Sequence, residues 1–170
     1  MSLFMYLNFN QSFKIPKRII LIGMPGVGKT TLGNEIRKFT NYPLFDTDKL
    51  LLNNKNVLTK DWIRFREKEG KLIKEIDETT FPYILSTGGG VVDSVENQKL
   101  LSKLAKSGVC IVNIVREVPD EVKKTRILPD SWENLYIKRN KLYRNITSCC
   151  YTNDKNPVYF VSWLLQKFSY

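Results

Sequence analysis

Eight residues near the start of the chain, Gly23-Met24-Pro25-Gly26-Val27-Gly28-Lys29-Thr30, constrain its fold more than any other stretch. They match the pattern G-x-x-x-x-G-K-[ST] in full, which is the signature of a loop that binds phosphate groups. The apolar run at residues 19–22 precedes the loop, and residues 31–39 follow it with helical character. A glycine-rich turn that merely precedes a helix would need neither the lysine nor the threonine. The sequence therefore predicts a nucleoside triphosphate site between a strand and a helix.

The residue types in this loop suit ATP and Mg²⁺. Glycines allow a tight turn whose backbone N–H groups point inward, and the positive end of the following helix adds to this anion site. Lys29 supplies a cation for the outer phosphates, and Thr30 supplies a hydroxyl for Mg²⁺. The residues expected to contact the nucleotide are Gly26, Val27, Gly28, Lys29, Thr30 and Thr31.

The composition limits the chemistry. The chain of 170 residues has no histidine, which excludes Ser-His and Cys-His nucleophile pairs and imidazole zinc sites. Its three cysteines are an odd number, which predicts reduced thiols and a cytoplasmic setting. No apolar run approaches membrane-spanning length, and residues 1–16 lack the pattern of a secretory signal and are interpreted as an N-terminal extension.

The formal net charge of +10 has two interpretations: a surface for nucleic acid, or an enzyme whose ligands are polyanions. The basic residues are spread along the chain, with the densest patches at residues 123–126 and 138–141. Charge alone does not decide between the two. Together with the phosphate loop it favours a small polyanionic ligand, so we expect no nucleic-acid or membrane partner and a monomeric protein.

Apolar runs alternate with amphipathic segments, which is the pattern of a parallel sheet covered by helices. Strands are predicted at residues 18–22, 42–45, 82–87, 109–115 and 147–151, and helices at residues 31–39, 61–78, 95–105, 132–144 and 158–168. Most of the polar candidate residues follow predicted strands. In open parallel sheets, ligands bind at this carboxyl edge.

Two carboxylates flank Thr47 directly after the second predicted strand. Asp46 could hold Mg²⁺ through water, and Asp48 could accept a proton from an alcohol that attacks the γ-phosphate. A D-x-D pair alone is weak evidence, because paired aspartates also end strands and cap helices. The functional interpretation rests on the phosphate loop one strand earlier.

Three consecutive glycines, Gly88, Gly89 and Gly90, follow the third predicted strand. They indicate close approach of the backbone to another group, although a flexible turn would have the same composition. Arg66 and Arg139 fall on predicted helices. Arginines on helix surfaces are commonly only solvated, but the planar guanidinium also suits two-pronged capture of a carboxylate.

These motifs occur in the order that is seen in shikimate kinases, and the chain resembles that family from about Arg18 to its C-terminus. The phosphate loop alone is shared by many families, whereas the combination with the following motifs is far more restrictive. The shared motifs are Asp46-Thr47-Asp48, F-R-x-x-E at residues 65–69, T-G-G-G at residues 87–90, R-x-x-L-Y at residues 139–143, and Asn156-Pro157.

The resemblance implies an α/β fold: a three-layer α/β/α sandwich with a five-stranded parallel sheet, similar to nucleoside-monophosphate kinases, with a short lid over ATP. It implies a single kinase domain at residues 17–170, with a substrate-binding segment at about 49–78 and a lid at about 123–138. It further implies Mg²⁺-dependent transfer of the γ-phosphate of ATP to the 3-hydroxyl of shikimate, on the route to chorismate and the aromatic amino acids.

The resemblance also implies roles for individual residues. Lys29 and Thr30 would serve ATP and Mg²⁺, Asp46 would hold Mg²⁺ through water, and Asp48 would bind and polarise the attacking hydroxyl. Arg126 would be the lid arginine that neutralises charge on the transferred phosphoryl group. Catalytic roles therefore fall on Lys29, Asp48 and Arg126, and the metal site on Thr30 and Asp46.

The remaining roles concern the two ligands. Arg66 and Arg139 would clamp the carboxylate of shikimate, and the backbone of Gly88, Gly89 and Gly90 would contact its hydroxyls. The base of ATP would meet Lys124, Asn156 and Pro157, with Lys124 standing where the family has a stacking arginine.

Two segments are shorter than in the family, namely the stretch between Asp48 and Arg66 and the lid between Lys123 and Arg139. The nearest alternative is a kinase of the same fold that acts on another polyol or carbohydrate acid, such as gluconate. A nucleotide-binding protein that holds nucleic acid without kinase activity is another. Both aspartates argue against it, because a pure binding protein has no use for a carboxylate aimed at a hydroxyl.

Overall fold

A computed structural model of the chain describes residues 14–52, 61–124, 128–147 and 149–168. They contain a five-stranded sheet in the order β2-β3-β1-β4-β5, and each neighbouring pair of strands is parallel. The strands are β1 (Arg18–Ile22), β2 (Leu44–Asp46), β3 (Tyr83–Ser86), β4 (Cys110–Val115) and β5 (Cys150–Thr152). The predicted five-stranded parallel sheet is confirmed.

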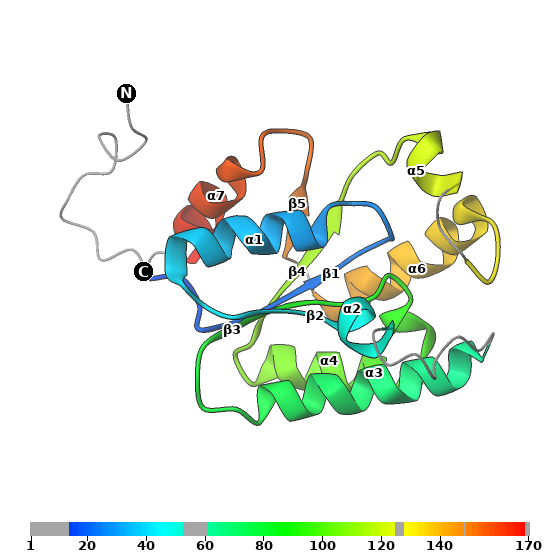
Figure 1. Ribbon diagram of the computed structural model, residues 1–170, viewed down its shortest axis with the longest axis horizontal. Coiled ribbons are helices and arrows are strands. Elements are labelled where there is room, and N and C mark those ends of the chain that lie inside the picture. The colour runs from blue at the N-terminus through cyan, green and yellow to red at the C-terminus, as the bar shows by residue number, and fades with distance from the viewer. Residues whose placement is uncertain (1–13, 53–60, 125–127, 148, 169–170) are drawn as a thin grey trace.

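Helices cover both faces of this sheet (Figure 1). One layer contains α1 and α7, which pack against each other, and the other contains α3 and α4, with α6 packed against α4. The helices are α1 (Lys29–Thr40), α2 (Thr47–Leu52), α3 (Trp62–Asp77), α4 (Val95–Lys106), α5 (Asp120–Lys124), α6 (Trp132–Ile146) and α7 (Val158–Phe168). This is the predicted three-layer sandwich.

Burial explains why the apolar runs form the central strands. The four apolar residues of β1, at 19–22, are each 0% exposed, because β3 and β4 flank the strand and helices cover both faces. Strands buried on both faces read as continuous apolar runs rather than as alternating patterns. Three helices begin at side-chain caps that accept a backbone N–H bond, which come from Asp61, Ser94 and Ser131.

Two predicted strands differ from the observed ones by more than one residue at an end. β2 comprises Leu44–Asp46 rather than residues 42–45, because Asp46 still pairs with Ser86 of β3. β5 is Cys150–Thr152 rather than residues 147–151, because Thr147 ends α6 and its N–H donates to Tyr143 O. Both strands are short edge strands, where few apolar residues mark the boundaries.

The sequence did not predict α2, α5 or the short 3₁₀ turn η3 (Val91–Asp93). α2 starts immediately after β2, and Oδ1 of Asp46 accepts a bond of 3.1 Å from the N–H of Lys49 in its first turn. The carboxylate that ends the strand therefore also caps the next helix. Its capping role and its proposed metal role are compatible, because they use different oxygens.

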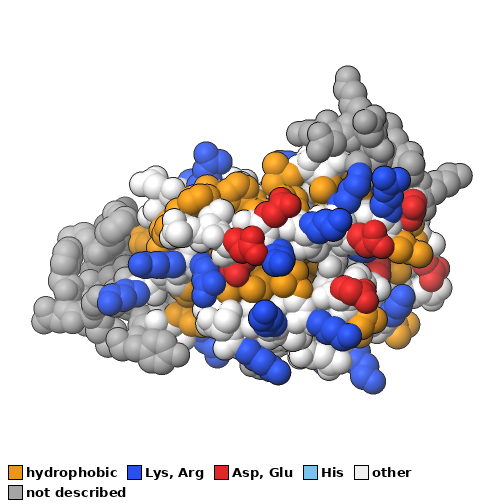
Figure 2. Space-filling model, turned by 90° about the horizontal axis from the view of Figure 1, so that it is seen from below, with side chains coloured by type: hydrophobic (Ala, Val, Ile, Leu, Met, Phe, Trp, Pro, Cys, Tyr) orange, Lys and Arg blue, Asp and Glu red, His pale blue; other side chains and the backbone are white. Residues whose placement is uncertain are grey.

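Basic side chains do not form one continuous patch on the face shown in Figure 2, where they alternate with acidic and apolar ones. Such interspersed charge is typical of a solvated protein surface. None of the helices in the described ranges has both the length and the apolar character needed to cross a membrane.

Candidate active site

The phosphate loop connects β1 to α1 and is shaped by glycines with positive φ. Gly23 has φ 140°, and a methyl group there would lie 2.4 Å from the carbonyl oxygen of Ile114 in β4. Gly28 has φ 93° and forms the N-cap of α1. Position 23 therefore requires glycine, both because a side chain would not fit there and because its φ is positive.

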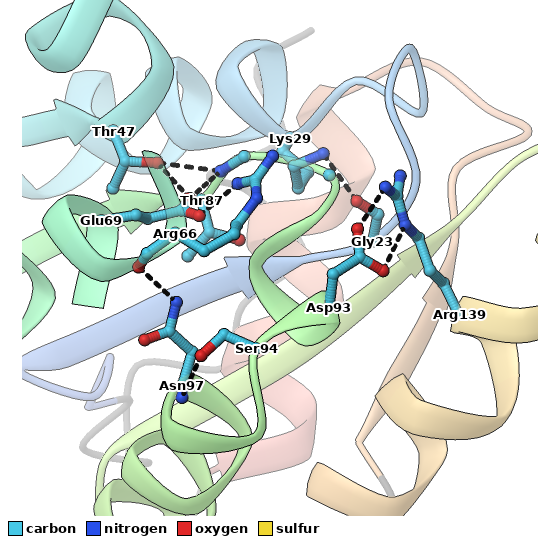
Figure 3. A network of polar contacts seen from close by, with 12 residues as sticks. Gly23, Lys29, Thr47, Arg66, Glu69, Thr87, Asp93, Ser94, Asn97 and Arg139 are labelled. Atoms are coloured by element: carbon cyan, nitrogen blue, oxygen red, sulfur yellow. Dashed lines mark hydrogen bonds and ion pairs between the residues drawn. The ribbon is translucent and has the colours of Figure 1, made fainter. Parts of the chain in front are cut away.

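Lys29 lies inside this loop rather than in solvent. Its ammonium donates to the carbonyl oxygens of Gly23 at 2.8 Å and Met24 at 2.9 Å, and the residue is only 8% exposed (Figure 3). The backbone carbonyl groups of the loop thus hold the Lys29 ammonium close to the start of α1. This is the position from which a lysine can reach the outer phosphates of a nucleotide.

The two residues predicted to hold Mg²⁺ lie next to each other. The hydroxyl of Thr30 donates to Oδ2 of Asp46 at 2.6 Å, and Oγ of Ser86 lies 3.2 Å from the same hydroxyl. All three groups are oxygens, and Mg²⁺ in kinase sites takes one or two protein ligands besides water and phosphate. The donor set fits Mg²⁺, and Ser86 joins it as a residue that the sequence analysis missed.

Asp48 and the glycine loop after β3 meet at Gly88. A methyl group on Gly88 would lie 2.4 Å from Oδ1 of Asp48 and 2.9 Å from both Nη1 of Arg66 and Oε1 of Glu69. Residues far apart in the chain therefore surround one backbone position. The predicted close approach of the glycine run to other groups is confirmed.

Arg66 and Arg139 converge on Gly90, although they belong to different helices. A methyl group on Gly90 would lie 2.7 Å from Nη2 of Arg66 and 2.9 Å from Nη2 of Arg139. Both arginines are buried, with 7% and 2% exposure. Buried arginines are rare unless they are paired, so each must have an acidic partner.

Glu69 is the partner of Arg66 on the same helix, three residues later. Its carboxylate also accepts hydrogen bonds of 2.8 Å from the hydroxyl of Thr47 and from the N–H of Gly88. Complete burial raises the pKa of Glu69, the Arg66 guanidinium opposes this rise, and the nearby Asp48 carboxylate adds to it. Glu69 thus joins α2, α3 and the glycine loop into one network (Figure 3).

Asp93 is the partner of Arg139 and comes from a different element, the 3₁₀ turn after the glycine loop. Oδ1 of Asp93 accepts from Nε of Arg139 at 3.1 Å, and Oδ2 accepts from Nη2. The carboxylate therefore meets one edge of the guanidinium with two parallel bonds, which is the strong geometry for this pair. Asp93 was missed by the sequence analysis.

Gly89 joins the glycine loop to the phosphate loop. A methyl group on Gly89 would lie 2.4 Å from Cδ of Pro25, and the carbonyl oxygen of Gly89 accepts a hydrogen bond from the hydroxyl of Tyr143 in α6. Burial raises the pKa of Tyr143, so the hydroxyl retains the proton that it donates. The phosphate loop, the glycine loop and α6 are thus in direct contact.

A cavity of about 280 Å³ adjoins the phosphate loop at Gly28 and the first turn of α1. Three residues predicted to contact the nucleotide, Gly28, Thr31 and Pro157, line it together with Arg116, Asn153, Asp154 and Lys155. Its volume suits a nucleotide base. Asn153 supports the loop directly, since its amide donates to the carbonyl oxygen of Val27 at 2.8 Å.

The other two residues predicted for the base do not line this cavity. Asn156 accepts a bond of 3.1 Å from the N–H of Val158 and so caps the start of α7. Lys124 lines a separate cavity of about 470 Å³ beside α5 and Trp132. Arg126 lies outside the described residues, as do residues 53–60 of the predicted substrate-binding segment and residues 1–13 of the extension.

Signals for some of the missed residues were present in the sequence. Glu69 and Tyr143 stand inside the F-R-x-x-E and R-x-x-L-Y motifs, where only the arginines received roles. Asp93 and Asn153 carried no such signal, because a single Asp or Asn after a loop usually serves as a cap or turn residue.

A phosphate loop in contact with a glycine loop that meets a carboxylate and two buried guanidinium groups is typical of P-loop kinases of small molecules. Comparison with known proteins narrows this class. Residues 25–168 match the shikimate kinase family, and the chain belongs to that family. Shikimate kinases use ATP with Mg²⁺, and the loop, Thr30 and Asp46 fit these ligands.

The chain also resembles part of much longer fungal proteins. It is 32% identical over 145 residues to the pentafunctional AROM polypeptide of Schizosaccharomyces pombe, which covers 76% of this chain and 9% of that polypeptide. It is 32% identical over 115 residues to the Saccharomyces cerevisiae AROM polypeptide, covering 62% of this chain and 7% of that one. The chain thus spans less than a tenth of the length of these curated relatives.

Solved structures support the same fold. Shikimate kinase from Acinetobacter baumannii, in complex with shikimate, superposes with a TM-score of 0.72 at 20% identity, covering 91% of this chain and 93% of that one. Shikimate kinase from Aquifex aeolicus superposes with a TM-score of 0.68 at 26% identity, covering 88% and 94%. A gluconokinase from Sinorhizobium meliloti is less similar, with a TM-score of 0.56 at 13% identity.

Proposed function

We propose that this chain transfers the γ-phosphate of ATP to the 3-hydroxyl of shikimate, with Mg²⁺, on the route to chorismate. The observation that carries this proposal is the convergence of two buried guanidinium groups on the backbone of Gly90, with Asp48 against Gly88 in the same loop. Two fixed cations suit a carboxylate on a rigid ring, because each can bind it through paired N–H groups. The Acinetobacter baumannii neighbour, described as a complex with shikimate, supports this choice.

In the proposed reaction, the 3-hydroxyl oxygen of shikimate forms a bond to the γ-phosphorus while the bond between that phosphorus and the β,γ-bridging oxygen breaks. The hydroxyl proton passes to the carboxylate of Asp48, and ADP leaves with the electron pair of the broken bond. Lys29 stabilises the charge that develops on the phosphate oxygens. Mg²⁺, when held by Thr30 and Asp46, supplies further neutralisation of that charge.

The remaining residues of the proposed site bind either shikimate or ATP. Arg66 and Arg139 hold the shikimate carboxylate, and the backbone of Gly88, Gly89 and Gly90 meets the ring hydroxyls. The residues of the nucleotide site are Gly26, Val27, Gly28, Lys29, Thr30, Thr31, Lys124, Asn156 and Pro157. Arg126 acts from the lid on the transferred phosphoryl group.

The proposal extends to organisation and setting. Residues 17–170 form one kinase domain, with a substrate-binding segment at about 49–78, a short lid at about 123–138 and an extension at residues 1–16. The protein works as a monomer in the cytoplasm. Its small-molecule partner is shikimate, and it needs neither nucleic acid nor a membrane.

A coupled assay of ADP release tests the proposal. Purified protein with ATP and Mg²⁺ receives shikimate, gluconate or single-stranded RNA in separate reactions, and ³¹P NMR identifies the phosphorylated product. We expect stimulation by shikimate alone, with one phosphorylated product. Stimulation by gluconate would indicate the related sugar-acid kinase, and stimulation by RNA without a phosphorylated acceptor would indicate the nucleic-acid-binding alternative.

A further inference from the structure

The two arginines beside Gly90 are held in different ways. Arg66 pairs with Glu69 on its own helix, so α3 alone sets their relative positions. Arg139 pairs with Asp93, which is 46 residues away in the chain and lies on η3. The position of Arg139 therefore depends on a contact between two separate elements (Figure 3).

The Asp93 contact determines the orientation of the Arg139 guanidinium. Its carboxylate engages Nε and Nη2, two nitrogens on one edge of the group, which fixes the guanidinium plane. The same Nη2 faces Gly90, only three residues before Asp93. A guanidinium has five N–H donors, and this edge-on pairing uses two of them. The glycine loop and its adjoining turn thus present Arg139 in one orientation.

Two cations lie near Asp93, and they differ in burial. Its carboxylate lies 3.9 Å from the ammonium of Lys138, whose side chain is 65% exposed, whereas the Arg139 side chain is 2% exposed. A pair with an exposed lysine at this distance contributes little, while a pair with a buried arginine contributes much more. Arg139 is therefore the partner through which Asp93 acts.

We propose that Asp93 is a positioning residue for the acceptor site: it orients the Arg139 guanidinium against Gly90, and so determines how tightly the acceptor carboxylate is held. This inference rests on the proposed function, because it takes Arg139 as a ligand of that carboxylate. Asp93 itself touches neither reacting group.

Charge alone predicts the opposite effect. Asp93 is negative, and a negative group near the site repels an anionic acceptor. If Asp93 only screened Arg139, its neutralisation would strengthen acceptor binding and lower the KM for shikimate. If Asp93 orients Arg139, its neutralisation releases a long side chain with several rotatable bonds, and the KM rises. The sign of the change distinguishes the two roles.

The experiment compares steady-state kinetics of Asp93→Asn, Asp93→Glu, Arg139→Ala and the double variant Asp93→Asn/Arg139→Ala. For Asp93→Asn we expect the KM for shikimate to rise about tenfold, the effect of one lost charge-assisted contact, with kcat and the KM for ATP nearly unchanged. Asp93→Glu, which keeps a carboxylate, should show a smaller rise. In the double variant, Asp93→Asn should add nothing to the effect of Arg139→Ala, because the group it positions is absent.

Lys138→Gln is the matched control, since it removes the other cation near Asp93, and its kinetics should equal those of the wild type. A lower KM in Asp93→Asn, an equal rise in Asp93→Glu, or additive effects in the double variant would each overturn the inference. If Arg139→Ala leaves the KM unchanged, the carboxylate clamp in the proposed function is wrong. If only Asp93→Asn leaves it unchanged, the clamp stands and the positioning role does not. Thermal unfolding of each variant, with kinetics recorded well below its midpoint, separates these results from loss of fold.

Discussion

The two halves of the site are built in contrasting ways. The donor half is a single loop, Gly23 to Thr30, whose shape depends on glycine conformations and whose cation bonds to carbonyl oxygens of the same loop. The acceptor half combines side chains from α2, α3 and α6 with the glycine loop after β3. The donor half is thus local in sequence, and the acceptor half exists only once the chain is folded.

The contrast extends to electrostatics. In the donor half, Lys29 is held by neutral carbonyl groups. In the acceptor half, each buried arginine has its own carboxylate, Glu69 or Asp93. The two halves thus hold their cations in different ways: the donor half uses backbone carbonyl groups, and the acceptor half uses carboxylates whose charges balance those of the two guanidinium groups. Mutations should affect one half without the other, except where the halves touch.

The largest effect is expected at Asp48, which in the proposed mechanism accepts the hydroxyl proton as the phosphoryl group passes from the donor half to the acceptor half. Asp48→Asn should lower kcat by a factor on the order of 10²–10⁴, because the variant cannot accept the hydroxyl proton. The affinity for ATP, measured by calorimetry, should remain near that of the wild type, since Asp48 is not part of the donor half. Turnover near the wild-type value would show that Asp48 does not accept the proton, and the division of the site into a donor and an acceptor half would then lack its catalytic group.

A second prediction tests the acceptor half alone. Gly90 has φ −104°, which any residue can adopt, so glycine is required there for space rather than for conformation. The added methyl group in Gly90→Ala would lie within 2.9 Å of both guanidinium groups and displace them. We expect the KM for shikimate to rise by roughly 10- to 100-fold, because small misplacements of binding groups are costly. The KM for ATP should not change.

Gly108→Ala provides the control for this prediction. Gly108 has φ 89° with no atom within 4 Å of an added methyl group, so the substitution strains the backbone far from the site. It should lower the unfolding temperature and leave both KM values unchanged. An equal effect of Gly90→Ala on both substrates would show that the two halves are not separable.

This division also explains which parts could be predicted from the sequence. The central strands and the helices α1, α3, α4, α6 and α7 followed from apolar periodicity, because burial imposes that pattern directly. The donor half was predictable because all of its parts are contiguous. The roles of Arg66 and Arg139 came from motifs, whereas their convergence on Gly90 required the fold.

The sequence could not predict the roles of the residues that support the site, Asp93 and Asn153, for a physical reason. Asp93 and Asn153 act through single long-range bonds, to Arg139 and to the carbonyl oxygen of Val27. Neither type of bond leaves a local pattern, since its partner is set by topology. The same holds for α2, which is six residues long and starts on a cap that also ends a strand.

A third prediction tests the donor half through one of these supports. Asn153→Ala removes the amide that donates to Val27 O at 2.8 Å and leaves that buried carbonyl without this donor. The loss of such a bond costs roughly 1 kcal/mol, so we expect the KM for ATP to rise about fivefold and the KM for shikimate to stay unchanged. The exposed Asn145→Ala on α6 should have wild-type kinetics. A change in the KM for shikimate alone would contradict the assignment of Asn153 to the donor half.

The smallest expected effect concerns Glu69 and the pH dependence of stability. Burial raises the pKa of Glu69 in the folded state above its ordinary value, so folding binds a proton in the pH range between the two values. The stability that this group contributes is therefore present below its unfolded pKa and is lost as the pH rises through its folded pKa. Relative to Glu69→Gln, the unfolding free energy of the wild type should fall as the pH rises from the ordinary pKa of a glutamate, about 4, toward the raised pKa of the folded state.

Urea unfolding of both proteins at several pH values measures this difference, and it cancels the titration of all other groups that the two proteins share. Glu75→Gln, which removes an exposed carboxylate from the same helix, is the matched control. A difference that increased with pH would mean that Arg66 and the two N–H and O–H donors outweigh burial, with a lowered pKa for Glu69.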